Sequence, residues 1–174
     1  MKNQGKTNII LISVCFSILF SQVPLGNVGK WYTIGAGIGE SLQNRAGNSS
    51  LLSGKISYGR EIKKLPVQFI IERSSGVLTG PEICSFNILS GRRQFGDNYF
   101  FSQAIGPSFL TYRYRQNDEA KTKNNGNSMG LAISCQFHYK VFSEFGIGLD
   151  LYGNLNGQVN VAGIRLELMI HNTL

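Results

Sequence analysis

Apolar and polar residues alternate along the segment MGLAISCQFHYKV (129–141). Every second residue from Met129 to Val141 is apolar or aromatic, whereas the residues between them, from Gly130 to Lys140, are small or polar. A period of two is typical of a β-strand with one apolar and one polar face, because successive side chains of a strand point to opposite sides. The segment is therefore predicted to be a strand that separates two different environments.

The same alternation recurs in seven further segments. These predicted strands are 31–40, 51–61, 66–73, 83–93, 98–115, 144–155 and 159–171. Each is near or above the ~9–11 residues that a tilted strand needs to cross a bilayer. In 98–115, Gln103 and Pro107 interrupt the pattern, which predicts a β-bulge at that point. No helix is predicted after residue 21.

The connections between the predicted strands differ in length on the two sides. The first (41–50) and the fifth (116–127) are long and polar, and the third (74–80) is intermediate. The even-numbered connections are short: 63–64, 94–97 and 142–143. The seventh (156–158) is also short and is an exception. Long loops on one side and tight turns on the other are typical of transmembrane β-barrels.

Aromatic residues are concentrated near the ends of the predicted strands, where membrane proteins place rings at headgroup level. Those expected near the short turns are Trp31, Tyr32, Tyr99, Phe100, Phe101, Tyr139, Phe142 and Phe145. Those expected near the long loops are Tyr112, Tyr114 and Tyr152. The distribution predicts two aromatic belts.

The amino terminus has the pattern of a secretory leader. Lys2 and Lys6 precede an apolar run from Ile9 to Phe20, which is too short to span a bilayer comfortably. The predicted organisation is a signal peptide over 1–21, a periplasmic segment over 22–30 and a barrel over 31–174. The alternative for the leader is an N-terminal buried or anchoring helix.

Composition is compatible with membrane strands and argues against a nucleic-acid partner. Charged residues make up 16% of the chain, below the ~25% that is typical of soluble domains. Removing Lys2 and Lys6 with the leader lowers the formal net charge from +7 to +5. The remaining basic residues are scattered and form no run that could act as a nucleic-acid arm. Cys84 and Cys135 fall on separate strands and are expected to be free thiols, and no metal-ligand cluster or cofactor motif is visible.

The leader, the segment LSGRRQFGDNYFFSQAIGPSF (89–109) and the closing FGIGLDLYGNLNGQVNVAGIRLEL (145–168) resemble the small outer-membrane β-barrel proteins of Gram-negative bacteria, of the OmpA/OmpX barrel type. The resemblance implies an all-β fold: an eight-stranded antiparallel up-and-down transmembrane β-barrel in the cell outer membrane. It also implies a monomer in contact with outer-membrane lipid and lipopolysaccharide, inserted by the outer-membrane assembly machinery. Such barrels commonly end with an aromatic residue, whereas this chain ends with Leu174.

An eight-stranded barrel is just wide enough for side chains to fill its interior. Charged residues on the predicted inner faces should pair, because an unpaired charge in a low-dielectric interior is costly. The residues expected in this interior polar network are Lys55, Glu61, Glu72, Lys140, Asp150, Arg165 and Glu167. Such an interior would be plugged, leaving recognition to the outer loops.

The longest predicted outer loop has mixed charge. It could contact lipopolysaccharide or a partner, or simply be solvated. Its polar residues include Asn117, Asp118, Glu119, Lys121 and Lys123. The expected role is therefore structural or surface-interaction, and not enzymatic.

Two other classes of protein share part of this pattern. A secreted lipocalin-like barrel would bind an apolar ligand, but it would expose small residues such as Gly35, Gly37 and Gly148 to water, where lysines and glutamates are usual. A lipid-modifying enzyme would need a Ser–His–acid set, and Ser134, His138 and His171 form no local one. The GAGIGE segment (35–40) lacks the spacing of a dinucleotide loop. The apolar strand faces are therefore predicted to contact lipid.

Overall fold

The computed structural model describes residues 29–42, 49–63, 65–77, 81–114 and 125–172. Within these ranges the chain forms eight strands and no helix. They are β1 (Lys30–Leu42), β2 (Ser49–Ile62), β3 (Leu65–Gly76), β4 (Pro81–Phe95), β5 (Tyr99–Tyr114), β6 (Asn125–Phe142), β7 (Phe145–Asn156) and β8 (Asn160–Asn172). No helix of the described residues is long and apolar enough to cross a membrane.

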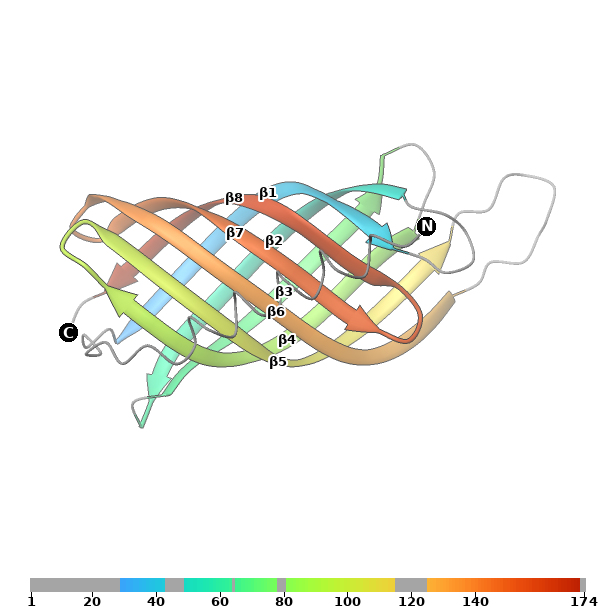
Figure 1. Ribbon diagram of the computed structural model, residues 1–174, viewed down its shortest axis with the longest axis horizontal. Helices are drawn as coiled ribbons and strands as arrows, with labels where there is room; N and C mark the ends of the chain where they lie inside the picture. Colours follow the sequence, from blue (N-terminus) through green and yellow to red (C-terminus); the bar gives the residue numbers. More distant parts are fainter. Residues whose placement is uncertain (1–28, 43–48, 64, 78–80, 115–124, 173–174) are drawn as a thin grey trace, which may run out of the picture.

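The strands pair in sequence order to form a closed antiparallel barrel (Figure 1). The barrel closes between its first and last strands, from Lys30 opposite Asn172 to Leu42 opposite Asn160. Every strand thus has two hydrogen-bonded neighbours, and no sheet edge is left open. The predicted all-β, eight-stranded up-and-down barrel is confirmed.

The two ends of the barrel differ in their connections. We call the end at which β1 begins and β8 ends the turn end. There, β2 joins β3 through residues 63–64, β4 joins β5 through 96–98, and β6 joins β7 through 143–144. At the opposite end, the loop end, β1, β3, β5 and β7 finish. The three short connections therefore lie together at one end, as the sequence predicts.

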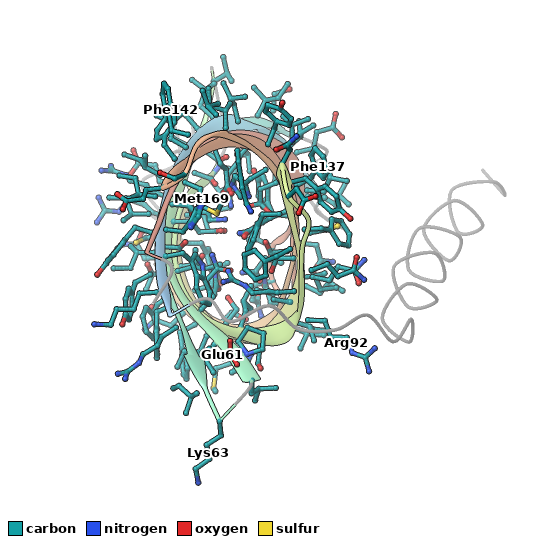
Figure 2. The ribbon with its side chains drawn as sticks, turned by 90° about the vertical axis from the view of Figure 1, so that its left-hand side faces the viewer. Glu61, Lys63, Arg92, Phe137, Phe142 and Met169 are labelled. Atoms are coloured by element: carbon teal, nitrogen blue, oxygen red, sulfur yellow. The ribbon has the colours of Figure 1, made fainter. Side chains whose placement is uncertain are left out.

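The alternation of side chains follows the predicted faces. Ile56 on the outer face of β2 is 65% exposed, whereas its neighbour Lys55 is 2% exposed and points inward. Seen from the turn end, Met169 points into the barrel while Phe137 and Phe142 point outward (Figure 2). The apolar face of 129–141 is therefore on the outside of the barrel, which is opposite to the arrangement of a soluble ligand-binding barrel.

Glycines on the inner faces make room for large interior side chains. A Cβ at Gly148 would lie 2.1 Å from the carbonyl oxygen of Phe137 and 2.6 Å from Cδ2 of His138. A Cβ at Gly35 would lie 2.9 Å from Cγ of Glu167. The small residues of these faces therefore line a crowded interior, as expected from the sequence.

The predicted bulge in β5 is wrong. Register pairs on either side of Pro107, Asn87 with Ser108 and Ser90 with Ile105, have the same offset. The pairing with β4 is interrupted at Pro107, which has no N–H to donate, and resumes without a shift. Gln103 does interrupt the alternation, since it is buried although its outward-facing neighbours Phe101 and Ile105 are partly exposed and exposed, respectively. The register shift occurs instead in β6, between Lys140 and Phe142 opposite β7.

The aromatic residues divide between the two surfaces of the barrel. Tyr32, Tyr99, Tyr139 and Phe142 are exposed on the outer face near the turn end, where an aromatic belt was predicted. Three others expected in the belts are inside the barrel. They are Trp31, Phe100 and Tyr152. Each of the three shares the inner-face parity of its strand, and proximity to a strand end does not decide which way a ring points.

Candidate functional site

A cluster of buried charges occupies the middle of the barrel interior. Lys55 of β2 contacts two acids of non-adjacent strands: its Nζ is 2.9 Å from Oδ2 of Asp150 on β7 and 2.5 Å from Oε1 of Glu167 on β8. All three side chains are at most 1% exposed. Because the lysine reaches strands that are not its neighbours in the barrel, these contacts span the interior.

Arg165 of β8 continues the charge cluster. Its Nη2 is 2.8 Å from Oε2 of Glu72 on β3, and its Nη1 is 3.3 Å from Oδ2 of Asp150. Its Nε donates a hydrogen bond to Oγ of Ser53 at 3.1 Å. The guanidinium also lies 3.3 Å from the centre of the Tyr152 ring. The arginine is thus held by two carboxylates, a hydroxyl and an aromatic face.

Polar side chains complete the charge cluster on the β6 side. Ser134 donates a hydrogen bond to Oδ1 of Asp150 at 2.7 Å, and Nε2 of His138 is 3.2 Å from Oε2 of Glu167. The two cations, Lys55 and Arg165, face three carboxylates in this cluster. The interior charge is therefore largely compensated within the cluster, as a low-dielectric environment requires.

Toward the turn end the interior contains a layer of hydrogen-bonded polar side chains and then a stacked arginine. The hydroxyls of Thr33 and Ser57 are 2.6 Å apart, and Nε2 of Gln68 donates to Oγ of Ser57 at 2.7 Å. Beyond them, the guanidinium carbon of Arg93 lies 2.8 Å from the centre of a Trp31 ring and 4.6 Å from that of Phe100. A cation against aromatic faces is a favourable electrostatic contact.

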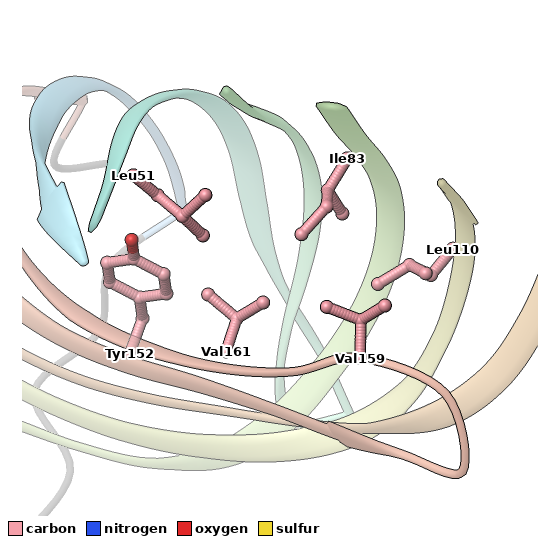
Figure 3. Packing of buried hydrophobic residues seen from close by; sticks show 6 residues of the cluster. All are labelled: Leu51, Ile83, Leu110, Tyr152, Val159 and Val161. Carbon is pink, nitrogen blue, oxygen red and sulfur yellow. The ribbon is translucent and has the colours of Figure 1, made fainter. Parts of the chain in front are cut away.

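At the loop end a group of apolar side chains packs together inside the barrel (Figure 3). We call this group the apolar cap: Leu51, Ile83, Leu110, Tyr152, Val159 and Val161. Its members come from β2, β4, β5, β7, β8 and the β7–β8 connection. Buried polar side chains lie at the same level: Ser41 and Asn154 are in register with Val161, and Nδ2 of Asn154 donates to Oγ of Ser108 at 2.6 Å.

Asn156 positions the β7–β8 connection in the barrel mouth. Its Oδ1 accepts hydrogen bonds from the backbone N–H groups of Gln158 at 2.9 Å and Val159 at 2.7 Å, and its Nδ2 donates to the carbonyl oxygen of Val159. Val159 is fully buried as a result. The short seventh connection, an exception to the loop-length pattern, therefore contributes Val159 to the barrel core, while Gly157 and Gln158 are exposed.

The structure brings together five of the seven residues expected in the interior network: Lys55, Glu72, Asp150, Arg165 and Glu167. Glu61 and Lys140 are apart from them, near the turn end. Glu61 is partly exposed, and Nζ of Lys140 donates to the carbonyl oxygens of Gly96 at 2.9 Å and Asp97 at 3.3 Å. Both residues lie close to strand ends, where the rim of the barrel offers solvent and turn carbonyls. Asn117, Asp118, Glu119, Lys121 and Lys123, expected in the outer loop, and the predicted signal peptide lie outside the described residues.

The described residues contain no group of three or more His, Cys, Asp and Glu that could hold a metal ion. Cys84 on β4 and Cys135 on β6 form no disulfide. Ser134 contacts Asp150 while His138 contacts Glu167, so these two residues belong to different pairs, and both are buried. The 35–40 segment lies within β1, without the helix that a dinucleotide loop requires.

Comparison with solved structures finds small barrels of the same architecture. Neisserial surface protein A (NspA) has a TM-score of 0.69 and 13% sequence identity, covering 85% of this chain and 100% of that one. Ail, the attachment invasion locus protein of Yersinia pestis, has a TM-score of 0.61 and 11% identity, covering 83% and 99%. The N-terminal β-barrel domain of Pseudomonas aeruginosa OprF has a TM-score of 0.52 and 12% identity, covering 83% and 100%. No protein-family model matches the sequence, and no curated protein matches it.

These similarities establish the fold, and the outer surface of the barrel agrees with it. The outward-facing residues of the strands form an apolar band, and the interior is polar and charged. This inside-out distribution is that of a barrel surrounded by lipid. The chain thus has the fold of the small eight-stranded outer-membrane β-barrels of Gram-negative bacteria, and its outer surface is that of a barrel embedded in lipid.

Proposed function

We propose that this protein is a closed, non-conducting barrel that presents its loop end at the cell surface, with a structural or surface-interaction role and no catalytic activity. The observation that carries the proposal is the filling of the interior at three levels: the apolar cap, the charge cluster and the Arg93 stack. An ion crossing the barrel would have to displace compensated charges and enter an apolar layer, and both steps are costly.

The orientation follows from the connections. In transmembrane barrels the short turns face the periplasm and the longer loops face outward. The turn end, with its connections 63–64, 96–98 and 143–144, would then be periplasmic. The outer loop with Asn117, Asp118, Glu119, Lys121 and Lys123 would be at the cell surface, available to lipopolysaccharide or to a partner. The chain would act as a monomer, delivered by a signal peptide over 1–21 and inserted by the outer-membrane assembly machinery.

One structural neighbour supports a surface-interaction role. Ail has also been solved in complex with the heparin analogue sucrose octasulfate, in a structure with a TM-score of 0.53 and 12% identity to this chain. A polyanion therefore binds to a barrel of the same fold. This supports anionic ligands as the first class to test against the basic residues of the outer loop.

Planar-bilayer recording tests the sealed interior. The purified, refolded barrel is expected to give no stepwise current, whereas a porin in the same bilayer serves as the positive control. The double variant Leu51→Ser/Val159→Ser hydrates the apolar cap and is expected to give rare, small openings. Regular channels from the wild-type barrel would contradict the proposal.

Surface exposure is tested separately. An epitope inserted between Glu119 and Ala120 should be detected by antibody on intact cells, whereas the same epitope after Leu174 should be detected only after the outer membrane is permeabilised. The reverse pattern would contradict the proposed orientation while leaving the sealed interior in place.

A further inference from the structure

The outer wall of the barrel has a groove at the loop end, over β3 to β6. Its volume is about 400 Å³. We call it the outer groove and define it by the outward-facing residues that line it: Arg73, Glu82, Cys84, Thr111, Arg113 and Asn127. These side chains belong to the wall that faces the membrane, and Ile83 and Tyr112, which lie at the apolar cap, complete the lining.

Strand register places the outer groove at the edge of the apolar band. One row across β3 to β6, on the outer face, is wholly apolar: Ile71, Phe86, Phe109 and Met129. The next row on the same face, two residues nearer the loop end, is Arg73, Cys84, Thr111 and Asn127. The wall therefore changes from apolar to polar within one row, which is the level at which lipid chains give way to headgroups.

The cations of this edge are gathered on one side of the barrel. Arg73 and Arg113 are exposed and line the outer groove. At the corresponding edge of β1, β2 and β8, the row beyond Ile38 consists of Glu40, Ser50 and Ala162. An anion approaching the loop end along the wall would thus meet arginine on one sector of the described residues and a carboxylate or small residues on another.

The outer groove is not a uniformly positive surface. Glu82 is paired in register with Arg113 and lines the same groove. The hydroxyl of Thr111 donates to the carbonyl oxygen of Cys84 at 3.3 Å. Among the described residues that line the outer groove, there are two guanidinium groups and one carboxylate, and the lining also includes Asn127. This combination suits a phosphate monoester, which takes several hydrogen bonds from planar guanidinium donors.

We propose that the outer groove binds the phosphate of a phosphorylated lipid in the surrounding outer leaflet. The phosphate would lie between Arg73 and Arg113 while the acyl chains of the same lipid cover the apolar row of Ile71, Phe86, Phe109 and Met129. A phosphorylated lipid would contact both the two arginines and the apolar row, whereas a free anion would contact only the arginines. The proposal rests on the outward orientation of the loop end, and it adds a site on the wall that is distinct from the outer loop.

Native mass spectrometry of the barrel from lipid nanodiscs tests this site. The discs contain phosphatidylcholine with a small fraction of bisphosphorylated lipid A, and the number of lipid A molecules retained by the barrel is measured. Arg73→Gln/Arg113→Gln is expected to reduce retention about tenfold, the effect of losing roughly one charge-assisted hydrogen bond. The matched control Lys30→Gln/Arg60→Gln removes the same charge from the outer face at the turn end, and should change retention little.

Further competition and lipid-substitution experiments identify the ligand. Inorganic phosphate in large excess should not displace lipid A, and lipid A stripped of its phosphates should be retained as poorly as by the double variant. Equal losses in the two double variants would show general electrostatic attraction and overturn the site. Displacement by inorganic phosphate, or equal retention of phosphatidylglycerol, would overturn its assignment to an outer-leaflet lipid. Both leaflets of the nanodisc contain lipid A, so these results do not depend on which end of the barrel faces the cell surface. A barrel whose loop end faces the periplasm would be detected only by the epitope experiment.

Discussion

Arg165 reaches across the barrel to Glu72, with its Nη2 2.8 Å from Oε2 of the glutamate. The two residues lie on β8 and β3, which are not adjacent in the barrel, and they are separated by 93 positions in the sequence. The ion pair therefore connects two non-adjacent strands through the barrel interior. Because Arg165 also contacts Asp150, it connects three strands through one guanidinium group.

Replacing Arg165 should destabilise the barrel strongly. Arg165→Met leaves Glu72 without its cation and Asp150 with Lys55 alone, and breaking a buried pair in this way costs about 3–5 kcal/mol. The double variant Arg165→Met/Glu72→Gln restores the original charge of the cluster and should recover a substantial part of that loss. Urea unfolding in lipid vesicles, followed by electrophoretic mobility without boiling, measures both values. Arg60→Met, on the exposed face of β2, is the control and should change the free energy of unfolding by well under that amount.

Gly59 should not tolerate a side chain. A Cβ at this position would stand 1.7 Å from Cε2 of Trp31 on the neighbouring strand. Gly59→Ala is therefore expected to lower the yield of folded barrel, and Trp31→Leu in the same chain should restore part of it. Gly54→Ala, on the same strand, is the matched control because a Cβ there meets nothing within 4 Å. Normal folding of Gly59→Ala would contradict the packing of Trp31 inside the barrel.

The pattern of residues along the chain was sufficient to predict the strands and their faces, because side-chain direction in a strand depends only on parity. It predicted that Lys55, Asp150 and Glu167 point inward. It did not predict that these three meet, because contact also depends on the height of each residue along the barrel, which is fixed by register and strand tilt. Glu61 and Lys140 have the same parity as the inward-facing residues of their strands, but they lie too near the turn end to contact the charge cluster.

Features made by the connections were the least predictable from the sequence. Val159 follows a polar turn, and its burial depends on the three hydrogen bonds that Asn156 makes to the backbone of the connection. Aromatic residues near strand ends were also ambiguous. Trp31 and Tyr32 are neighbours, yet one is buried and the other is on the outer surface. Parity, and not distance from the strand end, determines which of them contacts lipid.

The cost of a charge on the outer face should depend on its depth. Ile56, in the middle of β2, is 65% exposed to the membrane side. Ile56→Lys is expected to cost about 2–4 kcal/mol, and Ile62→Lys, at the turn end of the same strand, about 0–1 kcal/mol. Unfolding in vesicles gives both values. Equal costs at the two positions would contradict a membrane that surrounds the middle of the barrel.

Asn156 should contribute to stability more than its partly buried position suggests. Asn156→Ala removes the hydrogen bonds that hold the β7–β8 connection, so Val159 loses its place in the apolar cap. We expect a loss of about 1–3 kcal/mol in the free energy of unfolding. Gln158→Ala, at an exposed position in the same connection, should be close to neutral. A neutral Asn156→Ala would show that the cap is held by side-chain packing alone.

The chain contains a single tryptophan, and that residue is the one stacked on Arg93 inside the barrel. Its fluorescence therefore reports on the closing of the barrel and not on contact with lipid. Brominated acyl chains, which quench an indole that they touch, should leave Trp31 bright in the folded protein and quench it only while the strands are still apart. The molecule thus has a built-in optical probe that distinguishes adsorption to the membrane from completion of the fold.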